Sequence, residues 1–435
     1  MFRATGKPLI PLLGALALGA CALMCGGQAG AAGPGASAAR APARLLGGVN
    51  IGGPADIKRA RALHAAVVRT SVAWARLQPR GPGQYDAGAL AATDKLVNAA
   101  AAAGLRVIML VDTTPCWASS APAQLLGQCT PGQSSGATAW PPTNPADYAN
   151  FVAFLAQRYG DRLAALEVWN EPDHSNQVYF AGPHKAERYA ALLRAAYPAI
   201  KRAHAQTTVL GGSLVGSNGN FLRALYAAGI KGSYDGLAVH FYNVTLGSLR
   251  AIRETQLANG DRAPLWLDEF GWSSCWPRQR TQQEQACVTT RTQAANLSDL
   301  FRSLARAPYV AGAVVYKLQD SAGEDFGVLT RAGARKPAFA ALARVLASPV
   351  GNPHPVRLRL RRHSGRVVAS GSGPVGDFMQ LEAFRGSVLR YRALFTLDRF
   401  NRYSVALPGA LGTHGLRVRV YQYWSGVARA AKRSI

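Results

Sequence analysis

Two glutamates in this sequence are placed where a pair of carboxylates could do acid and base chemistry. Glu171 stands near the end of Glu167-Val-Trp-Asn-Glu-Pro172, and Glu269 lies within Leu265-Trp-Leu-Asp-Glu-Phe-Gly-Trp272. In both runs a carboxylate follows a short apolar segment that is typical of a strand, and a residue that breaks strands comes soon after it. Cleavage of a glycosidic bond needs one acid to protonate the leaving oxygen and a second carboxylate as nucleophile or as base for water. The pair therefore predicts a glycosidase.

The elements around these glutamates alternate between short apolar runs and longer helical patterns, which is typical of βα units and a parallel sheet. Eight such units predict an α/β fold, a (β/α)8 TIM barrel, in which the glutamates end the fourth and seventh strands at one face. A doubly wound open sheet is less favoured, because no Gly-rich phosphate motif follows the first strand. The expected strands are 45–51, 66–72, 106–111, 164–169, 208–214, 236–241, 264–268 and 311–318.

Composition divides the chain into three expected parts. Residues 1–44 combine a signal peptide with a flexible tether rich in Ala and Gly, which cannot bury enough apolar surface to fold. Residues 45–348 form the catalytic barrel. Residues 349–435 alternate apolar and polar residues at period two and predict a small β-sandwich domain. Its expected strands are 356–361, 366–369, 378–383, 387–392, 403–407 and 416–421.

The N-terminus is typical of an exported protein. Arg3 and Lys7 precede an apolar stretch that is too short to span a membrane. Leu18-Gly-Ala-Cys21 matches a bacterial lipobox, in which a lipidated Cys21 would tether a periplasmic protein to the membrane. Ordinary signal cleavage is the alternative, and it would leave a periplasmic or secreted protein. We expect a monomer.

Four cysteines lie in the part that is expected to fold. An even number in an oxidising compartment suggests two disulfides, for which three connectivities are possible. We favour the two local pairs, Cys116 with Cys129 and Cys275 with Cys287. No CxxC spacing or cluster of histidines accompanies them, so we expect neither a metal site nor a cofactor.

Three of these cysteines, Cys116, Cys129 and Cys275, fall in unusually long connections, 112–144 after the third strand and 270–281 after the seventh. Long connections in a compact domain are usually functional or disordered. These two also carry tryptophans, including Trp117 and Trp272. We expect the loops to shape a cleft above the barrel and these tryptophans to bind substrate, although aromatic rings that pack under the loops would explain the pattern equally well.

The formal net charge is +26, and clustered Lys and Arg would indicate nucleic-acid binding. Here the arginines are scattered and no nucleic-acid motif is present, so no nucleic-acid partner is expected. An acidic polysaccharide substrate or an anionic cell envelope is the better functional interpretation, and a genomic bias toward Arg explains the charge equally well. Residues 349–435 hold fifteen Lys and Arg against three acids, Asp377, Glu382 and Asp398.

Several motifs resemble those of a known group of enzymes. Trp169-Asn-Glu-Pro172, Leu267-Asp-Glu-Phe-Gly271 and Ala238-Val-His-Phe-Tyr242 resemble the clan A retaining glycoside hydrolases. The Pro115-Cys-Trp-Ala-Ser119 loop and the appended β-sandwich are most similar to family 39 and its bacterial exopolysaccharide-hydrolase relatives. The resemblance spans residues 45–347.

The resemblance implies a role for several residues. Glu171 would be the general acid/base, Glu269 the nucleophile and Asn170 the donor to the sugar 2-hydroxyl. His240 and Tyr242 would orient Glu269 and the substrate. Arg69, on the second strand, would keep the nucleophile ionised.

Three other residues need separate comment. On the eighth strand many clan members place a tryptophan under the sugar, whereas this chain offers Tyr316, Lys317 or Gln319, of which Lys317 could contact an acidic sugar. Glu167 is expected to be structural. Asp268 should point to the opposite face from its neighbour Glu269, because side chains alternate along a strand.

We therefore expect a retaining glycoside hydrolase that cleaves β-glycosidic bonds and acts inside chains of a bacterial exopolysaccharide. Two alternatives stay open: an exo-acting β-xylosidase or uronidase, which needs a closed pocket, and a barrel that binds polysaccharide without cleaving it.

Overall fold

The structure is a computed structural model. It describes residues 45–216, 218–242, 246–278, 287–348, 353–375, 378–422 and 429–435. The expected signal peptide and tether, with Cys21, lie outside these residues, as does the expected domain boundary at residue 349.

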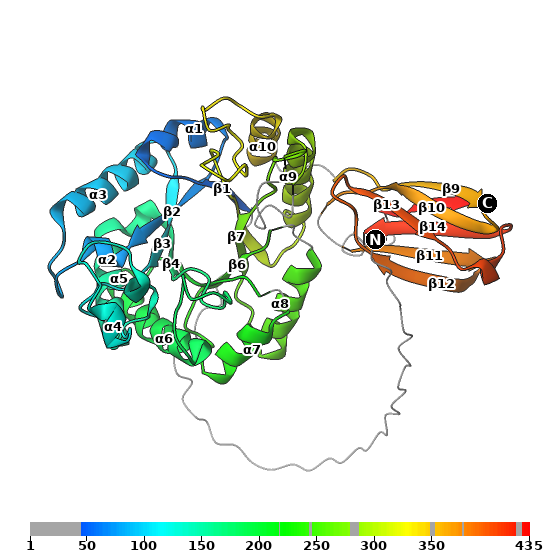
Figure 1. The fold of residues 1–435 in the computed structure, drawn as a ribbon. Coiled ribbons are helices and arrows are strands. Elements are labelled where there is room, and N and C mark those ends of the chain that lie inside the picture. Colours follow the sequence, from blue (N-terminus) through cyan, green and yellow to red (C-terminus); the bar gives the residue numbers. More distant parts are fainter. Residues whose placement is uncertain are drawn as a thin grey trace, which may run out of the picture. The chain divides into compact units, whose positions relative to one another are not determined.

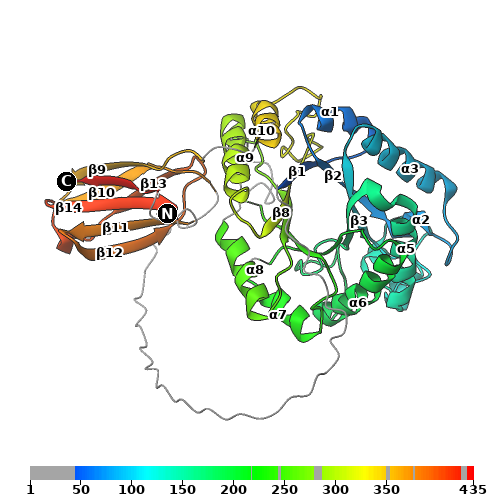
Figure 2. The same cartoon turned by 180° about the vertical axis from the view of Figure 1, so that it is seen from behind.

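Eight parallel strands close into a barrel in the order β1 to β8, which confirms the predicted (β/α)8 fold. Figure 1 shows the ring of helices around these strands, and Figure 2 shows the same ring from behind. The strands are apolar along most of their length because both faces of the sheet are covered. They are β1 Leu46–Asn50, β2 Val67–Ala73, β3 Arg106–Asp112, β4 Leu163–Val168, β5 Val209–Leu214, β6 Gly236–His240, β7 Leu265–Phe270 and β8 Val310–Val315.

The helices follow the strands in the expected order, and each buries an apolar stripe against the barrel. Local sequence sets several starts: Pro145 opens α5 while the Asn144 side chain accepts a hydrogen bond from the Ala146 N–H at 3.1 Å. The long helices are α1 Ile57–Ala62, α3 Ala87–Ala102, α5 Pro145–Tyr159, α6 Lys185–Ala203, α7 Asn220–Ala227, α8 Leu246–Ala258, α9 Thr290–Leu304 and α10 Pro337–Ala347, with short α2 Trp74–Leu77 and α4 Ala123–Leu126 between them.

The inside of the barrel is filled by side chains, as in other barrels of this class. The largest is Trp266 on β7, which lies between glycines of both neighbouring strands. A Cβ at Gly312 would lie 2.1 Å from the Trp266 ring, and one at Gly236 would lie 2.8 Å from it. The indole thus fits only because these two positions lack a side chain. The next residue that faces inward on β7 is Asp268.

Residues 353–375, 378–422 and 429–435 form two antiparallel sheets, in the orders β13-β10-β9 and β12-β11-β14-β15. Leu358, Val367 and Ala369 of the first sheet share one buried cluster with Leu381, Val418 and other residues of the second. Strand β15 was not expected from the sequence, because its four residues are mostly polar. The strands are β9 Arg357–His363, β10 Arg366–Ser372, β11 Met379–Arg385, β12 Val388–Phe395, β13 Arg402–Ala406, β14 Leu416–Gln422 and β15 Ala431–Ser434.

Candidate active site

Glu171 is presented by an unusual backbone immediately after β4. Trp169 has φ 72° and Glu171 has φ 46°, and this left-handed region is uncommon for residues with a side chain. Such conformations persist where packing holds them, and they cluster at functional sites. Here the buried Trp169 ring donates a hydrogen bond from Nε1 to the Tyr179 carbonyl oxygen at 2.8 Å. The chain therefore turns sharply and leaves the Glu171 carboxylate at the strand end.

Glu269 reaches the same face by a different route. On β7, Leu265 and Leu267 face the helices, while Trp266 and Asp268 face the barrel interior. The pairing of β7 with β8 then shifts between Leu267 and Phe270, where the ladder is irregular. This shift lets Glu269 also point into the barrel mouth. The expectation that Asp268 faces away from Glu269 is therefore wrong, because simple alternation does not hold at this strand end.

Arg69 on β2 is the centre of the site. It is 3% exposed and donates two hydrogen bonds to Glu167, from Nε to Oε2 at 2.7 Å and from Nη2 to Oε1 at 2.8 Å. It also donates to Glu269 Oε1 at 2.5 Å and to the Asn170 side-chain oxygen at 3.3 Å. Burial alone would lower the pKa of Arg69, but the surrounding carboxylates outweigh burial and raise it. The guanidinium is a fixed positive charge.

The two candidate catalytic carboxylates are close together. Carboxylate oxygens of Glu171 and Glu269 and a ring nitrogen of His240 all lie within 4.8 Å of one another. Glu269 also accepts a hydrogen bond from the Tyr242 hydroxyl at 2.6 Å. Retaining glycosidases hold their carboxyl groups about 5–5.5 Å apart, whereas inverting enzymes separate them by about 6.5–9.5 Å. The spacing found here fits retention.

His240 joins the two glutamates. Its Nδ1 lies 2.8 Å from Glu171 Oε1 and 3.6 Å from Glu269 Oε2. Burial lowers the pKa of His240, but Glu269, Glu171 and Asp268 together outweigh burial and raise the pKa to about 9. The Nδ1 atom of His240 therefore lies between the two carboxylates, within hydrogen-bonding distance of Glu171.

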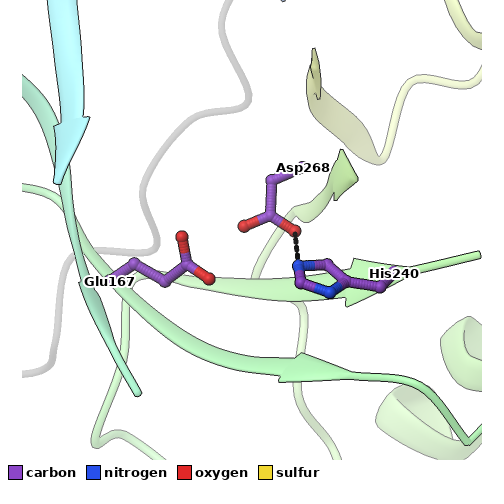
Figure 3. A group of neighbouring side chains, drawn as sticks. All are labelled: Glu167, His240 and Asp268. Atoms are coloured by element: carbon purple, nitrogen blue, oxygen red, sulfur yellow. Dashed lines mark ion pairs between the residues drawn. The ribbon is translucent and has the colours of Figure 1, made fainter. Parts of the chain in front are cut away.

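Beneath the mouth lie three fully or almost fully buried groups, Glu167, His240 and Asp268, whose side chains converge in Figure 3. Asp268 Oδ1 is 3.4 Å from His240 Nε2, and Asp268 Oδ2 is 3.5 Å from Arg69 Nε. Among the residues that the structure describes, neither Asp268 oxygen has a hydrogen-bond donor. Burial, followed by the negative charge of Glu167, raises the pKa of Asp268.

The three side chains also have the composition of a metal ligand set, and their ligand atoms lie within 4.8 Å of one another. The Arg69 guanidinium, however, already supplies a positive charge at the centre of this group. A proton on Asp268 is the simpler explanation, because burial and the negative charge of Glu167 raise the pKa of Asp268, whereas Arg69 holds the pKa of Glu167 low against the effect of burial.

A cavity of about 880 Å³ lies over these groups. All the expected substrate-contacting residues at the strand ends line it: Arg69, Asn170, His240, Tyr242, Tyr316 and Lys317, together with Glu171 and Glu269. Trp117 and Trp272 do not. Trp117 donates to the Gln78 carbonyl oxygen at 2.9 Å and packs on Trp74, and Trp272 is 3% exposed and packs on Phe270.

The loops that line the cavity also differ from expectation. Its described lining includes no residue of 113–144 or 271–278, which carry Cys116, Cys129 and Cys275, whereas His174 and Tyr179 come from the connection after β4. Residues 317–326 after β8 and residues 50–56 at the end of β1 also contribute to the lining. Their length had favoured the cysteine loops as the walls of the cleft, and this prediction is wrong for the described residues. Tyr179 was missed because one tyrosine in a polar connection has no distinctive spacing.

Lys317 is engaged within the protein. Its ammonium forms an ion pair with Glu324 and donates to the Ser321 hydroxyl at 2.6 Å. Tyr316 also bonds Glu324, at 3.2 Å. The expected contact between Lys317 and an acidic sugar would therefore have to compete with Glu324.

The two local cysteine pairs are present as disulfides, Cys116–Cys129 and Cys275–Cys287. Disulfides persist in oxidising compartments. Among the described residues, no helix combines the length and apolarity required to cross a membrane.

Comparison with known proteins agrees with this geometry. The model of the family described as cellulase (glycosyl hydrolase family 5) matches residues 47–303, which include both candidate catalytic glutamates and more than half of the chain. No curated protein is a significant match for the sequence.

Solved structures share the fold. A family 39 glycoside hydrolase from Bacteroides cellulosilyticus WH2 is 19% identical, with a TM-score of 0.54 over 84% of this chain and 80% of that one. A family 39 enzyme from Xanthomonas axonopodis pv. citri is 16% identical, with a TM-score of 0.51 over 91% and 96%. A family 39 β-xylosidase from Caulobacter crescentus is 17% identical, with a TM-score of 0.51 over 80% and 84%.

Proposed function

Because the chain belongs to the cellulase family, glycosyl hydrolase family 5, and is thus a retaining clan A glycosidase, we propose that Glu171 and Glu269 are its catalytic pair. The observation that carries the proposal is their close approach over one cavity, with Arg69 and Tyr242 on Glu269 and His240 on Glu171. Each glutamate thus has surroundings suited to a different role.

Glu269 attacks the anomeric carbon, and the bond to the leaving oxygen breaks as Glu171 protonates that oxygen. Arg69 and Tyr242 keep Glu269 anionic and aimed by donating to its two oxygens. Water then attacks the glycosyl-enzyme ester while Glu171 takes its proton, which restores both groups. Asn170, oriented by the contact of its oxygen with Arg69, donates its amide N–H to the sugar 2-hydroxyl.

Replacement of Glu171 or Glu269 by Gln tests this assignment. Loss of a group in a concerted catalytic unit lowers kcat by several orders of magnitude, and a 2-fluoro sugar should accumulate as an ester on Glu269 in the parent enzyme. Glu187→Gln, on the exposed face of α6, is the control and should behave as the parent does. If both variants kept the kcat of the parent enzyme, the proposal would be wrong.

We further propose that the substrate is a β-linked exopolysaccharide cut within the chain. A cavity of about 880 Å³ is near the upper end of the range for ligand sites, about 300–1,000 Å³, which supports room for more than one sugar. The lining carries six carboxylates, and its two permanent cations, Arg69 and Lys317, are both paired. This balance argues for a neutral substrate and against the uronidase alternative.

Product length separates endo from exo action. Oligosaccharides of mixed length, read by mass spectrometry early in digestion of a neutral β-linked polysaccharide, would support the proposal. Single sugars released from the first time point would replace it with an exo-acting β-xylosidase.

The two disulfides support our proposal that the protein is exported to the periplasm or beyond. Lipidation of Cys21 belongs to the same proposal, and Cys21→Ser should release the protein from the membrane fraction of a cell that expresses it. An unchanged distribution would exclude that anchor.

A further inference from the structure

The net positive charge of the chain is not concentrated at the candidate active site. The cavity lining is acidic, as described above, whereas residues 349–435 hold fifteen Lys and Arg against three acids. The basic part of the molecule therefore requires a separate explanation.

Five of these cations line one groove of about 780 Å³ between strands β9 and β15. Within the described residues, both are edge strands: β9 pairs with β10 alone and β15 with β14 alone. The groove contains no aspartate or glutamate side chain. Its charged members are Arg357, Arg359, Arg361, Lys432 and Arg433.

The spacing of the arginines follows from the strand. Leu358 is buried in the core between the two sheets and Leu360 packs against that core, so the alternation of side chains turns Arg357, Arg359 and Arg361 outward. Residues two apart on a strand are separated by about 6.6–6.8 Å. The row therefore presents three exposed guanidinium groups at a regular interval, with Lys432 and Arg433 across the groove.

These charges are not neutralised by the protein. No carboxylate of the described chain forms an ion pair with any of the five groove cations. By contrast, Glu382 on the neighbouring sheet is held by Arg392 and Arg419. Uncompensated charges of one sign that line a concave surface focus the electrostatic potential and attract counter-charges.

We propose that the β9–β15 groove binds a linear acidic polysaccharide, a partner distinct from the neutral polymer proposed as substrate. Repeated carboxylate or sulfate groups along such a chain match a row of cations at a fixed interval, and guanidinium groups bind these anions through paired N–H donors. Charged side chains also protect edge strands from pairing, but acids serve that purpose equally well, and this groove has no aspartate or glutamate side chain.

A polymer fits the groove better than a lipid surface does. Membrane-binding faces combine cations with exposed apolar side chains that enter the bilayer. The exposed large apolar residues of these sheets, Phe378, Val388, Leu389 and Leu394, are not among the residues that line the groove.

Binding of the full chain to immobilised polygalacturonate, with neutral dextran as the reference polymer, tests the proposal. We expect salt-sensitive binding to polygalacturonate and none to dextran. The combined variant Arg357→Gln, Arg359→Gln and Arg361→Gln should lose about three- to 150-fold in affinity, because three exposed ion pairs contribute roughly 0.2–1 kcal/mol each. The corresponding Arg→Lys variant should retain most of the affinity.

The matched control removes three exposed cations from the barrel, Lys58→Gln, Arg80→Gln and Arg202→Gln, and should bind as the parent does. Melting curves and hydrolysis of a small aryl glycoside confirm that each variant is folded, independently of binding. Equal losses in both triple variants would show that total charge, and not the groove, drives binding. Absence of binding by the parent, or groove-dependent binding to phosphatidylglycerol vesicles with none to polygalacturonate, would also overturn the proposal.

Discussion

At the scale of single residues, the site depends on how many negative charges one cation can support. Arg69 contacts Glu167 and Glu269 directly and lies 3.5 Å from Asp268. Three carboxylates this close to one guanidinium are costly unless one of them is neutral. Burial and the charge of Glu167 raise the pKa of Asp268, and among the described residues neither of its oxygens has a donor, so we predict that Asp268 is the group that keeps its proton.

The variant Asp268→Asn tests whether Asp268 is protonated in the folded protein. The folded-state pKa of Asp268 is raised above its ordinary value of 3.8, so the native state binds more protons than the unfolded state as the pH rises from that value. Parent stability is therefore lost with increasing pH, by up to about 1.4 kcal/mol per pH unit, until the folded-state pKa is passed. Asn, always neutral and able to donate to Glu167, avoids this loss.

Chemical denaturation at pH 4, 5.5 and 7 measures the effect. The variant should gain stability relative to the parent as the pH increases. Asp161→Asn, at a side chain that is 91% exposed, should show no such trend. A variant destabilised by the same amount at all three values would mean that Asp268 is ionised in the folded protein.

At the scale of elements, the connection from β4 to α6 is more informative than the longer cysteine loops. It begins with the left-handed Glu171 and carries Tyr179, whose ring is 40% exposed, lines the cavity and contacts His174 edge to face at 5.4 Å. The Trp169 indole fixes the Tyr179 backbone. An aromatic ring held at this position can stack on a sugar beyond the cleaved bond.

Tyr179→Ala should raise KM for oligosaccharides by about five- to tenfold, because one aromatic contact contributes roughly 1 kcal/mol. Hydrolysis of a small aryl glycoside should change little. Tyr179→Phe keeps the ring and should retain the parental KM. Val178→Ala, at a neighbouring side chain that is 65% exposed and outside the lining, is the control. An equal effect on both substrates would place Tyr179 at the bond-cleaving step instead.

The disulfide after β3 provides the complementary test. Cys116 and Cys129 close a loop of 13 residues that does not line the described cavity. Replacement of both by Ser should lower the free energy of unfolding by about 2–4 kcal/mol, while kcat on a small substrate is unchanged below the melting transition. A fall in kcat of the folded variant would mean that this loop supports the site.

At the scale of the molecule, the barrel was predictable because eight strand–helix repeats leave few alternative topologies. Counting these repeats also assigns Glu171 to the end of the fourth strand and Glu269 to the end of the seventh. The orientation of Asp268 did not follow, because a register shift on β7 leaves no trace in the alternation of apolar residues. The cleft walls were also missed, since loop length and aromatic content do not determine which loop folds over the barrel mouth.

The charge of the molecule was predictable as a sum but not as a distribution. Strand β9 ends at His363 and β15 begins only at Ala431. The two strands are therefore far apart in sequence, and only the folded sheets bring their cations together. From the sequence alone, the excess positive charge suggests an acidic polysaccharide substrate or an anionic cell envelope. In the folded chain, acids line the cavity at the candidate catalytic pair, whereas cations line the groove.

The packing of Trp266 between Gly236 and Gly312 also has an evolutionary consequence. A methyl group at either glycine would overlap the indole, so neither position can change while the tryptophan remains. Among homologues, the order of substitution should therefore be fixed: residue 266 becomes smaller first, and only then do positions 236 and 312 accept side chains. These three positions inside the barrel can therefore change only together. Lineages that keep the indole should keep both glycines.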